Sequence, residues 1–291
     1  MEIILGKTAG FCYGVTRAVD GAKEEVENNS EIYCLGEIVH NKNVVRKLEK
    51  QGIKFIDKIE EARGKTIIRA HGIPKQTYEK AIDMNIEIKD LTCPHVLKIH
   101  KIAEEYRKKE FFIVLLGKKN HPEAEAVLAI SDHIHLITSI DDLNLNLTEK
   151  LFVTNQTTMS ILEIEKIIEQ IEKKWPDAQI MREICNATSI RQKAVLDLKE
   201  KEIDLLIVVG DPHSNNTTKL KALGSESGIA HVIMIESVFD LNEEQIKNHN
   251  RIAITSGAST PTLLTNQVIE TLKHFASTQE FIYPEKNTQL I

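Results

Sequence analysis

The sequence has little of what would mark a membrane, secreted or nucleic-acid-binding protein. Its longest apolar runs, such as residues 111–116, are far shorter than the roughly 20 residues that span a bilayer. The first residues lack a basic stretch followed by a long apolar one, so no secretory signal is visible and we expect a soluble, cytoplasmic protein. The formal net charge of −6 gives no overall basic field for a nucleic-acid backbone. We therefore predict neither a membrane nor a nucleic acid as a partner.

Cysteine is also scarce, because the 291 residues include only four cysteines and no two of them form a C-x-x-C pair. This absence argues against a zinc ribbon, a thioredoxin-type site and a two-cluster ferredoxin. A disulfide framework is not expected in the cytosol, where thiols stay reduced. No Walker loop or G-x-G-x-x-G fingerprint follows a predicted strand, so a nucleotide site is unsupported. Any metal centre must draw its ligands from distant segments.

The composition, 42% hydrophobic and 27% charged, is that of a globular protein, and the chain carries a threefold repeat. Short β-branched runs alternate with amphipathic stretches of about ten to fifteen residues, which is typical of parallel-sheet α/β units. A strand, a cysteine and a helical pattern recur at Cys12, Cys93 and Cys185, about 80 to 90 residues apart. We predict an α/β fold of three similar modules with mainly parallel sheets, in preference to one twelve-stranded sheet. The modules span residues 1–93, 94–185 and 186–291, and the N-terminal strand and Cys12 are assigned to the first.

Polar residues follow the predicted strands at equivalent places in the three repeats. One strand of each repeat ends at a glycine, Gly36, Gly117 or Gly210, and a polar residue comes four positions later. A later strand of each repeat also ends in polar residues. Functional groups of open α/β sheets lie beyond the carboxyl ends of the strands. We therefore hypothesise that three such edges face one central pocket, to which His40, His71, His121, Thr157, Ser214, Asn216 and Ser259 would contribute.

The three repeated cysteines could together hold zinc or an iron–sulfur cluster, since both favour soft sulfur ligands. Three ligands leave one iron of a cubane cluster open to a substrate, much as catalytic zinc keeps an open position. Each cysteine also begins a helical pattern, where the helix dipole stabilises a thiolate. A single cysteine would more simply be core filler, and that is our prediction for Cys34, which lies within a strand.

The candidate pocket residues are mostly neutral hydrogen-bond donors, which suit a phosphate or diphosphate. The alternative for the serine, threonine and asparagine motifs is ordinary helix capping and turn formation. Glu123, two residues after His121 at a helix start, is either a cap or a proton donor. His213 has no assigned role.

These motifs closely resemble those of the 4-hydroxy-3-methylbut-2-enyl diphosphate reductase family, and they do so in family order over nearly the whole chain. The matching segments are Gly10-Phe-Cys12, Gly36-Glu-Ile-Val-His40-Asn41, Ala70-His71-Gly72, Thr92-Cys93-Pro94, His121-Pro-Glu123, Gln156-Thr-Thr158, Cys185-Asn-Ala-Thr188, Ser214-Asn-Asn216 and Thr255-Ser-Gly-Ala-Ser259.

The resemblance implies a pseudo-threefold trefoil of modules around one [4Fe–4S] cluster, which can be isolated as [3Fe–4S]. Its ligands would be Cys12, Cys93 and Cys185, and the open iron would take the substrate hydroxyl. The resemblance further implies that the diphosphate lies among His40, His71, His121, Ser214, Asn215, Asn216 and Ser259. It gives catalytic roles to Glu123, Thr157 and His121, with the first two delivering protons. The family has Ser-Ser-Asn at 214–216 and Asn at Ile190, so a polar role at Ile190 is in doubt.

The reaction that the resemblance implies is the reductive removal of the hydroxyl with two electrons and two protons, giving isopentenyl and dimethylallyl diphosphate. No flavin or nicotinamide site is visible in the sequence, so electrons are expected from a separate ferredoxin or flavodoxin. A cluster-dependent hydro-lyase is one alternative, and it would consume no reductant. A non-enzymatic iron–sulfur or zinc sensor or scaffold is another, and it would bind no diphosphate.

Overall fold

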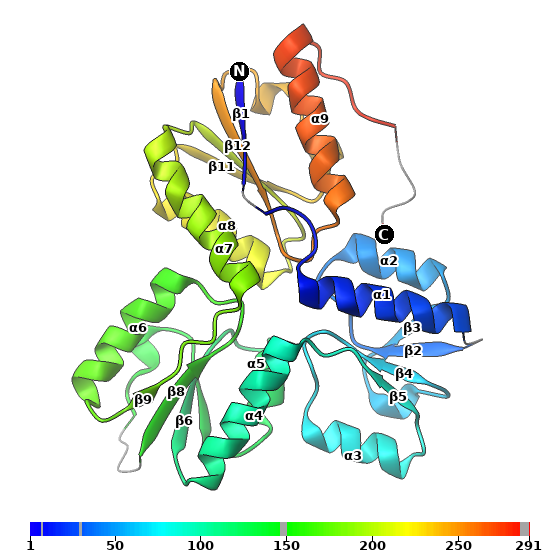
Figure 1. The fold of residues 1–291 in the computed structure, drawn as a ribbon, viewed down its shortest axis with the longest axis vertical. Helices are drawn as coiled ribbons and strands as arrows, with labels where there is room; N and C mark the ends of the chain where they lie inside the picture. The colour runs from blue at the N-terminus through cyan, green and yellow to red at the C-terminus, as the bar shows by residue number, and fades with distance from the viewer. Residues whose placement is uncertain (7, 29–30, 146–149, 286–290) are drawn as a thin grey trace. The chain divides into compact units, whose positions relative to one another are not determined.

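The computed structural model describes residues 1–6, 8–28, 31–145, 150–285 and 291, over which strands alternate with helices (Figure 1). The strands are β1 (Glu2–Leu5), β2 (Ile32–Leu35), β3 (Ile53–Ile56), β4 (Thr66–Ile68), β5 (Ile88–Asp90), β6 (Phe112–Leu116), β7 (Ile134–Ile137), β8 (Leu151–Asn155), β9 (Gln179–Ile180), β10 (Leu205–Val209), β11 (His231–Ile235) and β12 (Arg251–Ser256). The helices are α1 (Tyr13–Asn28), α2 (Lys42–Lys50), α3 (Lys75–Asp83), α4 (Pro94–Lys108), α5 (Pro122–Leu128), α6 (Ile161–Lys174), α7 (Asn186–Leu196), α8 (Asn215–Glu226) and α9 (Thr262–Thr278).

The strands form three four-stranded sheets with the orders β3-β2-β4-β5, β7-β6-β8-β9 and β11-β10-β12-β1. The pairings among the described residues are parallel. The three orders are equivalent, because β2, β6 and β10 lie inside their sheets and β3, β7 and β11 lie at an edge. The prediction of an α/β fold with three similar modules is confirmed.

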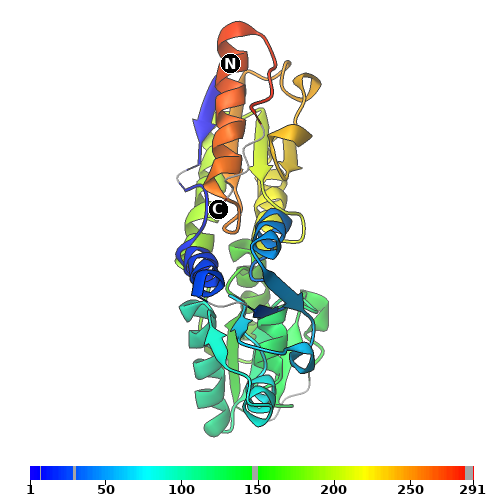
Figure 2. The ribbon, with the colours of Figure 1, turned by 90° about the vertical axis from the view of Figure 1, so that its right-hand side faces the viewer.

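Strand β1 belongs to the third sheet, so its assignment to the first module was wrong. It pairs with β12, with Ile3 opposite Ile252 and Leu5 opposite Ile254. Figure 2 shows β1, in blue, running beside the orange helix α9, which it contacts. Helix α9 is followed by no further strand among the described residues, and β1 takes the fourth place that β5 and β9 take in the other sheets. The boundaries 1–93, 94–185 and 186–291 otherwise stay a prediction.

Both faces of the sheets are covered, which explains why the strands read as continuous apolar runs. In β6, Ile113 and Leu115 pack against Ile99 of α4, whereas Val114 and Leu116 belong to a separate cluster with the inner face of α6. Burying an aliphatic side chain of this size contributes about 1.5–3 kcal/mol. In the part of the chain that the structure describes, no helix is both long enough and apolar enough to cross a bilayer.

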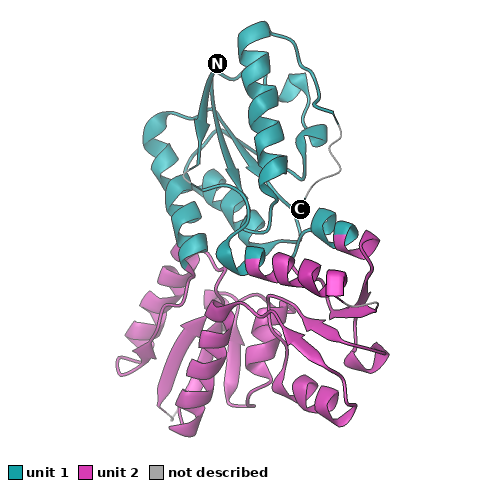
Figure 3. Ribbon diagram, turned by 45° about the vertical axis from the view of Figure 1, so that its right-hand side comes forward, with its two compact units in different colours: residues 1–16, 40–47, 186–291 teal, residues 17–39, 48–185 magenta. Residues whose placement is uncertain are grey.

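The chain divides into two compact units (Figure 3). Unit 1 comprises residues 1–16, 40–47 and 186–291 and holds the sheet that includes β1. Unit 2 comprises residues 17–39 and 48–185 and holds the other two sheets. The pseudo-threefold arrangement of the modules around a central cluster stays a prediction.

Candidate active site

The three predicted cysteine ligands occupy the same position in their modules. The N–H of each donates to the carbonyl oxygen of a residue just beyond the end of the neighbouring strand, and a helix begins at the next residue. These pairs are Cys12 with Ala258 at 2.9 Å, Cys93 with Ala70 at 2.9 Å and Cys185 with Thr157 at 3.2 Å. All three side chains are partly exposed. The predicted placement of the cysteines at strand ends and helix starts is confirmed, while their role as ligands stays a prediction.

Cys34 differs from the other cysteines in its burial and in its position within a strand. It is fully buried within β2, and its Sγ donates to the carbonyl of Gly36 at 3.2 Å. Burial raises the pKa of the Cys34 thiol to about 12, so the thiol stays neutral near pH 7. A neutral buried thiol is a poor metal ligand, and the prediction of a core residue is confirmed.

The chemistry of Cys12, Cys93 and Cys185 suits an iron–sulfur cluster, which prefers cysteine sulfur as a ligand. None of the four cysteines, all of which the structure describes, forms a disulfide, and three of them combine partial exposure with a place at a helix N-terminus. Cys12 belongs to unit 1, whereas Cys93 and Cys185 belong to unit 2. Within the described residues, no three His, Cys, Asp or Glu side chains gather as a metal site.

In unit 2, a buried carboxyl group lies against the residue that anchors Cys185. Glu123, in the first turn of α5, is 2% exposed. Its Oε1 accepts the Thr157 N–H at 2.6 Å, and its Oε2 lies 2.8 Å from Thr157 Oγ1. The Thr157 carbonyl in turn accepts the Cys185 N–H. Thr157 thus connects a titratable carboxyl group to a predicted ligand.

Burial raises the pKa of Glu123 to about 7, although the two hydrogen bonds from Thr157 act in the opposite direction. A carboxyl group with this pKa is protonated in a substantial fraction of molecules near neutral pH. A pKa close to the working pH is the property that a general acid needs. Because the side chain is buried, Glu123 is not simply a solvated glutamate at a helix start.

Two of the predicted substrate-binding histidines lie together in unit 2. The rings of His71 and His121 are edge to face, with centroids 5.7 Å apart. His121 is the N-cap of α5, and its Nδ1 accepts the N–H of Glu123 at 3.2 Å. His121 therefore caps the helix that carries Glu123 in its first turn.

In unit 1, Ser259 joins two further predicted residues. Its Oγ donates to the His40 carbonyl at 2.9 Å and lies 3.5 Å from the Oγ of Ser214. Ser214 caps α8 by accepting the Thr217 N–H. The structure therefore brings His40, Ser214 and Ser259 together at the carboxyl edge of the third sheet. Capping and a function in binding are compatible, because a serine hydroxyl has two acceptor lone pairs.

Asn216 links α8 to the segment that anchors Cys12. Its Oδ1 accepts the Ala258 N–H at 2.9 Å, and its Nδ2 donates to Thr188 at 3.4 Å. The Ala258 carbonyl accepts the Cys12 N–H. Asn216 therefore plays in unit 1 a part comparable to that of Glu123 in unit 2, because each accepts the N–H of the residue whose carbonyl accepts a cysteine N–H. Asn215 is also buried in the first turn of α8.

Sequence reasoning missed Asp211. This residue is 3% exposed, and its carboxylate accepts the backbone N–H groups of Lys42 and His213, each at 2.8 Å. These bonds keep the pKa of Asp211 below its ordinary value, although burial acts in the opposite direction. The position of Asp211 directly after Gly210, at a strand end, was the available signal. The His213 side chain is exposed and contacts Asp211.

Comparisons with known sequences give a consistent result. A family model described as LytB protein matches residues 3–273. A relative from Brevibacillus brevis, named 4-hydroxy-3-methylbut-2-enyl diphosphate reductase, is 39% identical over 303 residues, which cover 99% of this chain and 96% of the relative. A relative of the same name from Caldanaerobacter subterraneus is 38% identical over 288 residues, covering 96% of this chain and 99% of the relative.

Solved structures agree with these sequence matches. The E-1-hydroxy-2-methyl-but-2-enyl-4-diphosphate reductase of Plasmodium falciparum superimposes with a TM-score of 0.91 at 32% identity, covering 100% of this chain and 94% of that one. A second structure, described as the terminal enzyme of the non-mevalonate pathway, gives a TM-score of 0.68 at 30% identity. The fold and these matches define an oxidoreductase built from three α/β modules. The chain belongs to the LytB family, and the family membership expected from the motifs is confirmed.

Proposed function

We propose that this chain reduces (E)-4-hydroxy-3-methylbut-2-enyl diphosphate to isopentenyl diphosphate and dimethylallyl diphosphate. The balanced reaction uses two electrons and two protons, breaks the allylic C–O bond and releases the hydroxyl as water. The observation that carries the proposal is the path from Glu123 through Thr157 to Cys185. Two successive hydrogen bonds, from Thr157 Oγ1 to Glu123 and from the Cys185 N–H to the Thr157 carbonyl, connect this carboxyl group to a predicted ligand. Its pKa is raised to about 7.

Cys12, Cys93 and Cys185 would hold one [4Fe–4S] cluster per chain. Such a cluster supplies electrons one at a time and offers one iron without a protein ligand to the substrate oxygen. The placement of each cysteine at a helix N-terminus supports this role, because the helix dipole stabilises a thiolate. Cys34 would take no part, since its thiol is buried and neutral.

Glu123 would be the proton donor, with Thr157 as the residue that orients its carboxyl group. Two contacts from Thr157, through N–H and Oγ1, fix both carboxyl oxygens. Burial keeps the proton on Glu123 near neutral pH and excludes bulk water from it. His121, whose Nδ1 is held by the Glu123 N–H, would assist on the same helix.

The diphosphate would be bound by imidazole, hydroxyl and amide side chains. The proposed set is His40, His71, His121, Ser214, Asn215, Asn216 and Ser259, as the family resemblance implies. Its support in unit 1 is the grouping of His40, Ser214 and Ser259 at the N-terminus of α8, where backbone N–H groups favour an anion. In unit 2 the support is the adjacent His71 and His121 rings.

Electrons would come from a separate ferredoxin or flavodoxin, since the chain shows no nucleotide fingerprint. The test uses reduced methyl viologen in place of this partner. Cluster-loaded protein and the hydroxylated diphosphate are mixed without oxygen, and dye oxidation is followed together with products. We expect two electrons consumed per five-carbon product. Products without dye oxidation would identify a hydro-lyase, and no diphosphate binding would favour a sensor.

A further inference from the structure

Arg191 is a buried cation in α7, the helix that begins directly after Cys185. The residue is 3% exposed. Its Nη2 donates to the Gly10 carbonyl at 2.7 Å, and its Nε donates to the Ser256 carbonyl at 3.2 Å. Gly10 precedes Cys12 by two residues. The helix that follows one cysteine thus holds the segment that leads into another.

Arg17 repeats this arrangement in the next module. It lies in α1, the helix that begins directly after Cys12. Its Nη1 donates to the Thr92 carbonyl at 2.9 Å, and its Nη2 donates to the Asp90 carbonyl at 3.4 Å. Thr92 is the residue before Cys93. An arginine of the helix that begins after Cys12 therefore hydrogen-bonds the backbone of the segment that precedes Cys93.

Lys98 completes the pattern. It lies in α4, which begins directly after Cys93, and its Nζ is 2.8 Å from both carboxylate oxygens of Glu183. Glu183 precedes Cys185 by two residues. This contact differs from the other two, because the Lys98 side chain is 57% exposed and the acceptor is a side chain. An exposed ion pair contributes less than a buried charged hydrogen bond.

We propose that Arg17, Lys98 and Arg191 are positioning residues, which we call the relay cations, that fix the three cysteine segments for cluster binding. Each lies in the helix that follows one cysteine and contacts the segment that precedes another. Arg17 connects the Cys12 helix to the Cys93 segment, Lys98 the Cys93 helix to the Cys185 segment, and Arg191 the Cys185 helix to the Cys12 segment. The inference rests on the proposed cluster. Its physical basis is that a metal site binds tightly only when other residues hold its ligands in place.

The threefold recurrence separates this proposal from incidental packing. The three cations occur five or six residues after their cysteines, at about the same helical turn, although their acceptors differ chemically. We expect the contribution to cluster binding to follow burial. It should be largest for Arg191, which is buried, smaller for Arg17, which is half-buried, and smallest for Lys98, which is exposed.

Amide hydrogen exchange of the metal-free protein tests the positioning directly. Arg191→Met should speed exchange at Gly10 and Cys12 about tenfold, as expected for loss of a charged hydrogen bond, and leave Thr92 and Cys93 unchanged. Arg17→Met should speed exchange at Thr92 and Cys93 and leave Gly10 and Cys12 unchanged. Lys98→Met should speed exchange at Glu183 and Cys185 less than about threefold, because its ion pair is exposed.

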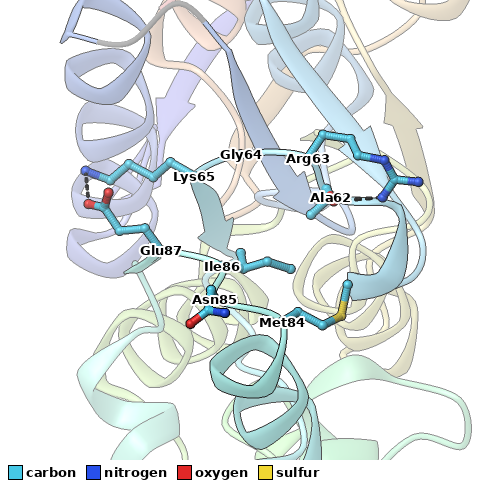
Figure 4. Close-up of a pocket in the computed structure, with 8 residues that line it drawn as sticks. All are labelled: Ala62, Arg63, Gly64, Lys65, Met84, Asn85, Ile86 and Glu87. Carbon is cyan, nitrogen blue, oxygen red and sulfur yellow. Dashed lines mark hydrogen bonds and ion pairs between the residues drawn. The ribbon is translucent and has the colours of Figure 1, made fainter.

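Arg63 provides the matched control. Its Nη1 also donates to backbone carbonyls, those of Glu60 and Ala62, at 2.8 and 2.9 Å, and Figure 4 shows the bond to Ala62. Neither carbonyl belongs to a cysteine segment, so Arg63→Met should change exchange at none of these segments. Arg191→Lys should restore part of the protection, since an ammonium group can still reach one carbonyl. Uniform faster exchange in every variant, or none in Arg191→Met, would overturn the proposal.

Cluster loading gives the second readout. After anaerobic reconstitution, Arg191→Met should retain less than about half of the wild-type iron and sulfide, with a larger share of three-iron signal in the electron paramagnetic resonance spectrum. Full loading with an unchanged spectrum would contradict the proposal. If the wild-type protein itself binds no cluster, the proposed function fails, whereas the exchange pattern still decides whether the relay cations hold the cysteine segments. If Arg191→Met does not fold, Arg17→Met is the deciding variant.

Discussion

The four thiols of this chain meet two kinds of environment, and the difference predicts which of them bind iron. Cys12, Cys93 and Cys185 are partly exposed and each lies directly before the first residue of a helix. Cys34 is buried among apolar side chains of β2, with its pKa raised to about 12. A residue type alone does not make a ligand, because its surroundings set the charge it can carry.

Serine substitutions test this distinction. Cys12→Ser, Cys93→Ser and Cys185→Ser should each remove most of the cluster and reduce activity at least about 100-fold, since a serine hydroxyl is a poor ligand for iron. Cys34→Ser should leave the iron content and activity nearly intact. The measurement is iron and sulfide per chain after anaerobic reconstitution. Equal losses in Cys34→Ser would refute the ligand assignment.

Glu123→Gln tests the proton donor. The variant should keep its cluster and its affinity for the diphosphate but lose about 100-fold or more in turnover, as expected when a general acid is removed. Wild-type turnover should fall as the pH rises through about 7, where the carboxyl group loses its proton, whereas the residual rate of the variant should show no such step. Near-normal turnover of the variant would reduce Glu123 to a structural role.

The same substitution changes how stability depends on pH. The folded-state pKa of about 7 lies above the ordinary value of 4.5, so folding favours the protonated carboxyl group. This contribution is fully present below about pH 4.5 and is lost as the pH rises through about 7. Urea unfolding should therefore show that wild type loses more stability than Glu123→Gln between pH 5 and pH 8, by up to about 3 kcal/mol. Parallel profiles would contradict the raised pKa.

The sequence indicated the proposed ligands and the proposed acid more readily than the residues that hold them. Cys12, Cys93 and Cys185 stood out because a rare residue type recurs at equivalent positions, and Glu123 because a titratable residue begins a helix two positions after His121. Arg191 did not stand out, since a single arginine in a helix is most simply read as part of a solvated face. Only the structure shows that its guanidinium is buried against Gly10 and Ser256.

At the scale of elements, the segment before Cys12 requires glycine at one position. Gly10 has a φ of +86°, and its N–H donates to the Oγ of Ser256 at 3.0 Å. A Cβ at this position would lie 2.1 Å from Thr262 Oγ1. The loop therefore requires glycine for two independent reasons, its backbone angle and its close approach to α9.

Gly10→Ala separates these reasons when it is compared with Gly228→Ala. Gly228 has nearly the same φ, +85°, but nothing lies within 4 Å of its added Cβ. Gly228→Ala should cost about 1–2 kcal/mol for the left-handed backbone alone. Gly10→Ala should cost about 1–3 kcal/mol more for the steric clash, and it should also weaken iron retention. Urea unfolding measures both costs, and equal costs would show that the loop moves aside without penalty.

The order of strands and helices could be predicted element by element, but the sheet that each edge strand joins could not. Residues 2–5 read as a short strand, and β1 is one. Its pairing with β12, about 250 residues away, depends on which sheet has an unfilled edge, and a four-residue strand does not encode that choice. The central strands were easier to assign because burial on both faces leaves a continuous apolar run.

At the scale of the whole molecule, the predicted ligands are divided between the two units. Unit 1 supplies Cys12, and unit 2 supplies Cys93 and Cys185. Repeat order predicted three modules, yet it carried no information about how the modules group into compact units. That grouping depends on contacts among side chains distant in the sequence.

Removing the iron should therefore destabilise the folded protein. A cluster that binds only the native state stabilises it by mass action, so anaerobic chelation should lower the thermal midpoint by at least about 5 °C. Cys12→Ser should abolish this difference as completely as Cys93→Ser does. Calorimetry with and without cluster measures it. A full difference in Cys12→Ser would mean that unit 1 contributes no ligand.

The most direct test of the account is Mössbauer spectroscopy of protein reconstituted with the Mössbauer-active iron isotope, recorded with and without the hydroxylated diphosphate. We predict one [4Fe–4S] cluster per chain in which one iron differs from the other three, and a change at that iron alone when the substrate is added. A cluster whose four irons are all bound by protein, or a spectrum that the diphosphate leaves unchanged, would contradict the proposed three-cysteine site.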